Sequence, residues 1–240
     1  MERHTRNNKE LVGALQSLSD IHSATREALA ATLDLKDQGT SGHCRRVAHL
    51  TLGIAQEPAL DSNALVQIEY GALLHDIGKL RVPDRILWKT GGLTEKEWAI
   101  MRRHPQDGFN LLGRLEFLRG GAEIVLSHHE KFDGSGYPHG LKGREIAIGA
   151  RIFSIVDAVD AMVHDRPYHR CVSFEQASEE VMRGAGSHFD PDIVQPALEY
   201  LTRQLLAGLP SANRIARPQF AIDLQIGNSN GEKTYHQLMQ

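Results

Sequence analysis

The stretch Leu74-His75-Asp76-Ile77-Gly78-Lys79 places two metal-binding side chains at the end of an apolar segment and follows them with glycine and lysine. A second stretch begins with a His-His pair and runs into a glycine-rich turn, His128-His129-Glu130-Lys131-Phe132-Asp133-Gly134-Ser135-Gly136-Tyr137-Pro138. Each stretch sets metal-binding side chains at the edge of an apolar helix. Together they predict a hydrolase that depends on more than one metal ion.

The composition is that of an ordinary globular chain of 240 residues, with 41% hydrophobic and 24% charged residues. No apolar run reaches the roughly 20 residues of a membrane-spanning helix. The net charge of −3 gives no broad attraction for nucleic acid. We therefore expect neither a nucleic acid polymer nor a membrane as partner. The polar N-terminus and the presence of only two cysteines, Cys44 and Cys171, favour a cytoplasmic location and exclude a thiolate zinc site.

Helical periodicity dominates the chain, which predicts an all-α fold. Asp61 and the capping box Thr94-Glu95-Lys96-Glu97 predict helix starts. The predicted helices include residues 9–35, 43–57, 61–76, 122–131, 149–163, 173–182 and 190–205.

The organisation predicted from this pattern has three parts. Residues 1–36 form an N-terminal helix, residues 37–207 the catalytic domain, and residues 208–240 a poorly ordered tail. Leucines recur at helical spacing in the first part. The N-terminal helix can therefore pack on the core or serve as a signalling or dimerisation helix, and both interpretations stay open.

Buried polar residues are the candidates for metal ligands. His75 and Asp76 close an apolar run, and Asp157 interrupts the apolar segment 152–159. Burying a carboxylate there is costly unless a cation or a hydrogen-bond network meets it. Histidine and aspartate together suit iron, manganese or zinc. Because neighbouring helical residues point about 100° apart, His75 can bind one ion while Asp76 reaches toward a second.

Several motifs together resemble the HD-GYP family, phosphohydrolases of the HD superfamily that degrade cyclic di-GMP. The resemblance covers about residues 37–191 and implies an HD-type helical bundle with a buried binuclear metal centre. The motifs occur in the family's order: His43, His75-Asp76, His104-Pro105-Gln106-Asp107-Gly108, His128 to Pro138, Asp157, Asp160-Ala161-Met162, Arg166-Pro167-Tyr168 and Phe189-Asp190-Pro191.

The resemblance implies two divalent metal ions that share one carboxylate. The residues implied for the first ion are His43, His75, Asp76 and Asp157, and those for the second are Asp76, His104, His128 and His129. Iron or manganese is expected, with nickel and zinc left open. Some relatives hold a third ion through a glutamate four residues before the first histidine. Here that position is Gly39, so we expect two ions.

The resemblance also implies residues that act on the substrate. Asp76 and Lys79 are the expected catalytic residues, with Lys79 at the scissile phosphate or the leaving group. Gly78 is expected to keep that approach open. The residues implied for substrate binding are Lys79, Arg166, Arg170 and Tyr137, and Asp160 is expected to hydrogen-bond behind the ligands.

The implied activity is that of a cyclic-dinucleotide phosphodiesterase. Cyclic di-GMP would be hydrolysed to pGpG by a metal-bound hydroxide, with further hydrolysis to GMP left open. One alternative is another cyclic dinucleotide, such as a mixed guanine–adenine one. A second is a catalytically weak receptor that docks diguanylate cyclases (GGDEF domains) through Gly136-Tyr137-Pro138, and a weaker third is an HD-type nucleotidase. A homodimer is left open as well.

Overall fold

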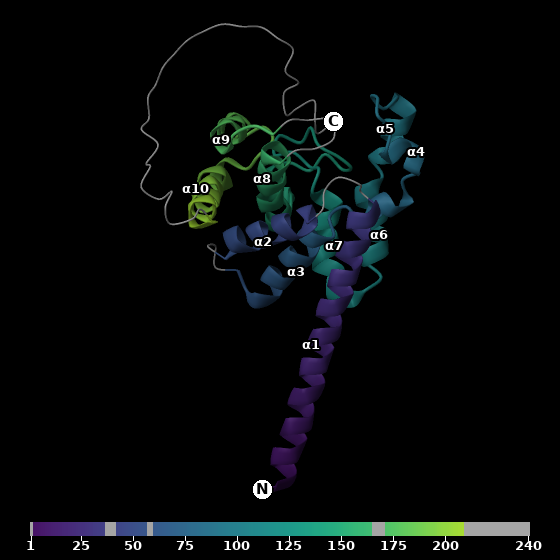
Figure 1. Ribbon diagram of the computed structural model, residues 1–240, viewed down its shortest axis with the longest axis vertical. Coiled ribbons are helices and arrows are strands. Elements are labelled where there is room, and N and C mark those ends of the chain that lie inside the picture. The colour runs from purple at the N-terminus through teal and green to yellow at the C-terminus, as the bar shows by residue number, and fades with distance from the viewer. Residues whose placement is uncertain (1, 37–41, 57–59, 165–170, 209–240) are drawn as a thin grey trace, which may run out of the picture.

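The computed structural model describes residues 2–36, 42–56, 60–164 and 171–208, and the regular elements in these residues are helices joined by turns and loops (Figure 1). The all-α prediction is confirmed. Among the described residues the only β-type pairing is an isolated bridge between Ala185 and Phe189. The α-helices are α1 (Glu2–Lys36), α2 (His43–Ala55), α3 (Ser62–Leu73), α4 (Asp84–Leu87), α5 (Glu95–Met101), α6 (His104–Leu112), α7 (Arg119–Ser127), α8 (Ile148–Val163), α9 (Phe174–Arg183) and α10 (Pro191–Gly208), and the 3-10 helices are η1 (Ile77–Arg81), η2 (Glu116–Leu118) and η3 (Gly143–Glu145).

The core is a bundle in which α2 packs on α3 and α8, and α3 packs on α7. Helix α8 is buried on nearly every side, from Gly149 to Met162. A helix that is apolar all round has to be surrounded by other elements, and α2, α3, α7, α9 and α10 contact it. Two carboxylates, Asp157 and Asp160, lie inside this buried helix. They therefore need charged partners, and the site described below supplies them.

The two helix starts predicted from cap residues are confirmed, whereas the predicted starts at residues 9 and 122 lie after the observed ones, at Glu2 and Arg119, and two predicted helix ends are wrong. The Asp61 side chain accepts a hydrogen bond from the Ala64 amide, and Thr94 forms a capping box with Glu97. Helix α3 ends at Leu73 instead of continuing through Asp76. Helix α7 ends at Ser127, before the His-His pair. His75 and the His128-His129 pair therefore lie in turns, where neighbouring side chains can point into one site.

Helix α1 extends from the body of the molecule as a long rod whose last turns alone reach the bundle (Figure 1). Ala30 and Leu33 are buried, whereas Leu11, Val12 and Ile21 are exposed. The C-terminal turns thus fit the packing interpretation of this helix, and dimerisation through its first turns stays a prediction. The tail beyond residue 208 lies outside the described residues. None of the described helices has both the length and the apolarity needed to cross a bilayer.

Candidate metal centre

Two clusters of metal-binding side chains meet at the centre of the bundle. We call His104, His128 and His129 the histidine cluster, and in it the ligand atoms lie within 4.8 Å of one another. We call His43, His75 and Asp157 the carboxylate cluster, which meets the same limit. The histidine cluster comes from the start of α6 and the end of α7, and the carboxylate cluster from α2, the α3–η1 turn and α8.

Asp76 lies between the two clusters. Its Oδ2 is 3.1 Å from His75 Nε2, and its Oδ1 is 3.4 Å from His104 Nε2. One carboxylate oxygen therefore faces each cluster. The structure thus brings together all seven residues that the sequence analysis assigns to the two ions, with Asp76 in the place expected of a shared ligand.

Three of the histidines are held by the same local device. The Nδ1 atoms of His75, His104 and His128 lie 2.7–2.9 Å from the backbone carbonyl three residues earlier in each case. A carbonyl can only accept, so each Nδ1 donates and each Nε2 carries a lone pair. Carbonyls at helix C-terminal ends lack helical partners and are available for this role. These hydrogen bonds orient the Nε2 lone pairs of the three imidazoles toward the centre of the site.

His43 is oriented by a carboxylate instead of a carbonyl. Its Nδ1 lies 2.7 Å from Asp160 Oδ2, and its Nε2 lies 3.3 Å from Asp157 Oδ1. Asp160 also accepts two hydrogen bonds from Arg46, at 2.9 and 3.0 Å. Asp160 therefore lies behind the site, where the sequence analysis expects a supporting hydrogen bond.

Burial keeps the histidine cluster uncharged. It lowers the pKa of His104 to about 4 and, together with the neighbouring His104, that of His128 to about 3. Burial and the adjacent His128 also lower the pKa of His129 well below its usual value. At neutral pH all three imidazoles are neutral, which is the form that binds a metal ion.

At the carboxylate cluster, charged neighbours outweigh the effect of burial on the pKa values. Burial acts to lower the pKa of His43, but hydrogen bonds with Asp157 and Asp160 outweigh it and raise the pKa to about 9. Burial acts to raise the pKa of Asp76, but Lys79 and His75 hold it well below its usual range. Asp76 is therefore ionised, and it can serve as an anionic ligand to a cation at either cluster.

The donor set fits divalent metal ions. His104 Nε2 and His128 Nε2 lie 3.2 Å apart, and the carbonyl bonds make both of them acceptors. Two acceptors at that distance need a proton or a cation between them, and the pKa values of both rings disfavour the proton. Imidazole nitrogens with two carboxylates suit borderline ions such as iron, manganese or zinc.

Gly78 permits a close approach between the two segments that carry Asp76 and His104. A Cβ atom on Gly78 would lie 1.9 Å from the His104 carbonyl oxygen and 2.7 Å from the Gly108 amide nitrogen. The expectation that Gly78 opens a path for the substrate is therefore not what its surroundings indicate. The glycine is needed because η1 packs directly on the start of α6.

Two of the predicted substrate-binding residues, Lys79 and Tyr137, lie at the site. Lys79 Nζ is 2.8 Å from Asp76 Oδ2. The Tyr137 ring stacks on His129 at 4.7 Å between centroids and an angle of 25°. Arg166 and Arg170 lie in residues 165–170, outside the described residues.

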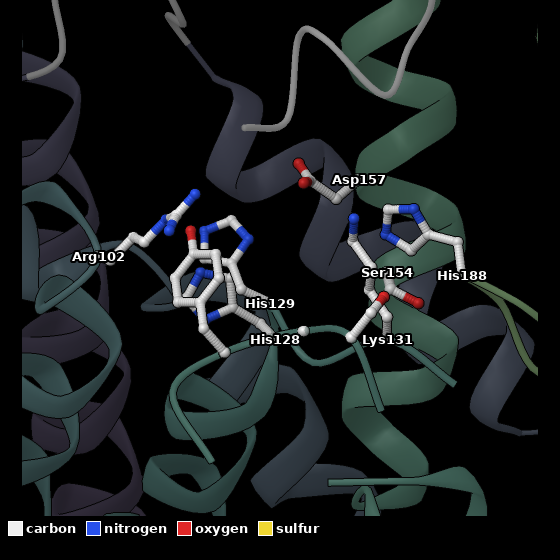
Figure 2. A pocket seen from close by; sticks show the side chains of 10 residues that line it. Arg102, His128, His129, Lys131, Ser154, Asp157 and His188 are labelled. Atoms are coloured by element: carbon white, nitrogen blue, oxygen red, sulfur yellow. The ribbon is translucent and has the colours of Figure 1, made fainter. Parts of the chain in front are cut away.

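A pocket of about 160 Å³ opens beside the histidine cluster (Figure 2). Several residues that line this pocket were not predicted from the sequence, namely Arg102, Lys131, Ser154 and His188. A usable signal was present for two of them, because Arg102 precedes a candidate ligand by two residues and Lys131 follows one by two. Basic residues so close to ligands are candidates for contact with an anionic substrate.

Glu130 organises the loop that carries Tyr137. The carboxylate is buried and accepts hydrogen bonds from the backbone amides of His139 and Leu141, at 2.7 and 3.1 Å. Gly136 crosses close to this residue, since a Cβ there would lie 2.5 Å from Glu130 Cα. The loop is therefore fixed against the end of α7, with the Tyr137 ring over His129.

Comparison with known proteins assigns the family. The model of the HD domain matches residues 27–193. The chain belongs to the HD-domain family. The resemblance to HD-GYP domains that the motifs indicate is confirmed.

Two curated relatives and one solved structure illustrate the range of this family. The chain is 42% identical over 175 residues to a cyclic di-GMP phosphodiesterase of Thermotoga maritima, covering 72% of this chain and 48% of the relative. It is 37% identical over 186 residues to 3'3'-cGAMP-specific phosphodiesterase 2 of Vibrio cholerae, covering 75% of this chain and 36% of the relative. The HD domain of the Listeria monocytogenes phosphodiesterase PgpH shares the fold, with a TM-score of 0.52 and 19% identity, over 75% of this chain and 97% of that domain.

These curated relatives are longer proteins. The chain spans about half the length of the first and about a third of the second. The PgpH domain, by contrast, is covered almost completely. What this chain shares with its relatives is therefore the HD domain itself.

Proposed function

We propose that this HD domain is a metal-dependent phosphodiesterase that hydrolyses cyclic di-GMP to pGpG. The observation that carries the proposal is the position of Asp76, with one carboxylate oxygen toward each cluster of ligands. Two sites that share a carboxylate suit the in-line displacement of a phosphodiester. Relatives that are 37–42% identical carry the names of cyclic-dinucleotide phosphodiesterases.

The ligand assignments are part of this proposal. His43, His75 and Asp157 would hold one ion, His104, His128 and His129 the other, and Asp76 both. When bound, two such ions would supply Lewis acidity and lower the pKa of a water molecule near the phosphorus. We propose iron or manganese, because imidazole and carboxylate ligands suit both.

The chain's own groups would hold the substrate and keep the ligands in the right form. Lys79 carries a cationic group 2.8 Å from Asp76, where it can donate to a phosphoryl oxygen or to the leaving oxygen. The Nδ1 hydrogen bonds of His75, His104 and His128 fix each imidazole tautomer. Arg166 and Arg170, which follow α8 in the sequence, would add phosphate contacts.

A mixed guanine–adenine cyclic dinucleotide is the second candidate substrate, since a cGAMP-specific phosphodiesterase is a relative of similar identity. Both substrates present the same phosphodiester to the metal centre, so they differ only in base contacts. Rates measured with equal concentrations of the two dinucleotides would rank them.

The test of the proposed function is anaerobic incubation of the metal-loaded protein with cyclic di-GMP, with products separated by chromatography. We expect metal-dependent pGpG, and its absence with Asp76→Ala. Tight binding of cyclic di-GMP without product would favour a receptor instead. Absence of both binding and product in the wild-type protein would contradict the proposal.

The proposal also includes a protein partner and a cellular location. Docking of diguanylate cyclases through Gly136-Tyr137-Pro138 would use the outer side of the loop, because the Tyr137 ring packs on His129. A cytoplasmic location agrees with a sequence that holds only two cysteines, Cys44 and Cys171.

A further inference from the structure

Two cationic side chains line the pocket beside the histidine cluster, and neither is assigned to the metal centre. We call Arg102 and Lys131 the basic rim; both side chains line the pocket together with His128 and His129 (Figure 2). Arg102 comes from the end of α5 and Lys131 from the turn after α7. The fold thus places two cations that are 29 positions apart in the sequence at the same pocket.

Arg102 is held in place by aromatic rings. Its guanidinium carbon lies 5.5 Å from the Trp98 ring centroid and 5.7 Å from the Tyr137 ring centroid. A guanidinium that stacks through its face keeps its N–H donors at the edge, in a planar fork that matches a phosphate. Because the Tyr137 ring also stacks on His129, the fork has a fixed position relative to the histidine cluster.

Lys131 adds a second positive charge to the same pocket. Within the part of the chain that the structure describes, no carboxylate forms an ion pair with it. The nearby Asp133 accepts a hydrogen bond from the Ser135 amide at 2.8 Å. Asp133 and Arg102 both act on Lys131 electrostatically, and the attraction to Asp133 is stronger than the repulsion from Arg102. One nearby carboxylate does not neutralise both cations, so an anion in this pocket would meet two charged hydrogen-bond donors.

A cyclic dinucleotide carries two phosphodiesters, and only one of them can lie at the reacting position beside Asp76 and Lys79. We propose that Arg102 and Lys131 bind the other phosphodiester, the one that is not hydrolysed. The basic rim then selects cyclic dinucleotides over diesters with a single phosphate, and it orients the ring for attack. This inference rests on the proposed function.

The test compares two substrates in the metal-loaded protein. Cyclic di-GMP has two phosphates, whereas bis(4-nitrophenyl) phosphate has one and probes the metal centre. In the double variant Arg102→Gln/Lys131→Gln we expect the KM for cyclic di-GMP to rise by about 10- to 100-fold with little change in kcat, because uniform binding is lost. The loss on the one-phosphate diester should be at least tenfold smaller.

The matched control is Lys96→Gln/Arg103→Gln. It also removes one lysine and one arginine charge, but from exposed positions in and next to α5. It should behave like the wild type with both substrates. A KM for cyclic di-GMP within threefold of wild type in the rim variant, or equal losses on both substrates, would overturn the inference. Wild-type protein that cleaves only the one-phosphate diester would instead overturn the proposed function, and the inference with it.

Discussion

The histidine cluster and the carboxylate cluster lie in one site but balance their charge in opposite ways. The histidine cluster contains no carboxylate of its own. Its three imidazoles are neutral because burial lowers the pKa of each ring. In the carboxylate cluster, Asp157 and Asp160 raise the pKa of His43 to about 9. A cation can enter the first without displacing a proton, whereas at the second it has to replace the proton on His43.

This difference shows how a buried, highly polar site can be compatible with folding. Neutral histidines avoid the cost of burying charge. At the other cluster His43 compensates Asp157, and His43 and Arg46 compensate the supporting Asp160. Asp76 joins the two arrangements and is itself compensated by Lys79.

Removal of the shared carboxylate should disable both clusters. We expect Asp76→Ala to lower phosphodiesterase activity by a factor on the order of 10³ or more and to reduce bound metal at both positions. Elemental analysis and product chromatography measure the two effects. The control is Asp84→Ala, an exposed carboxylate that pairs with Lys36. Activity of Asp76→Ala near that of this control, at full metal loading, would remove Asp76 from the mechanism.

Removal of a ligand from one cluster should affect that cluster more than the other. We expect His129→Ala and Asp157→Asn each to lower metal content from about two ions per chain to about one, with activity reduced by roughly 10²-fold. Wild-type protein with one or three ions would refute the two-ion prediction. Loss of both ions in both variants would show that the clusters do not bind independently.

A methyl group at Gly78 should disturb the contact that places the two clusters side by side. Because its Cβ would lie 1.9 Å from the His104 carbonyl oxygen, backbone has to move. We expect Gly78→Ala to lower the free energy of unfolding by about 3 kcal/mol, measured by urea titration. In the control Gly91→Ala, the added Cβ meets no atom within 4 Å. Equal stability of the two variants would contradict the close-packing account.

The candidate ligands were accessible from the sequence because they interrupt apolar helices in a recognisable order. His75, Asp76 and Asp157 are each flanked by residues of the core, and this pattern requires no knowledge of tertiary structure. Asp160 could be predicted as a supporting residue because it follows Asp157 by three positions on the same helix. The cap residues likewise predicted where α3 and α5 begin.

Two kinds of feature could not be predicted in this way. Helices α3 and α7 lack a glycine directly after their last residue, so the sequence gives no clear stop before His75 and His128. The basic rim depends on how the turn after α7 packs against the end of α5, and hydrophobic periodicity does not report loop packing. The contact at Gly78 is equally a product of tertiary packing.

The smallest effect predicted for a single residue is its contribution to the pH dependence of the metal-free protein. His104 and His128 have folded-state pKa values of about 4 and 3, below the 6.5 of an unfolded chain. As the pH falls below 6.5, the unfolded state gains protons that the folded state does not, so stability decreases by about 2 kcal/mol per histidine at pH 5. His43, with a raised pKa of about 9, contributes stability that is complete below pH 6.5 and is lost as the pH rises to 9.

The metal-free protein should therefore be most stable near pH 6.5, with the acid loss due to one cluster and the alkaline loss due to the other. Urea unfolding between pH 5 and pH 9, in the presence of a chelator, measures both losses. Asp160→Asn removes a partner that raises the pKa of His43, so it should shrink the alkaline loss and leave the acid loss in place. If both losses changed together in Asp160→Asn, the two clusters would form one coupled titrating unit, and the division between them would fail.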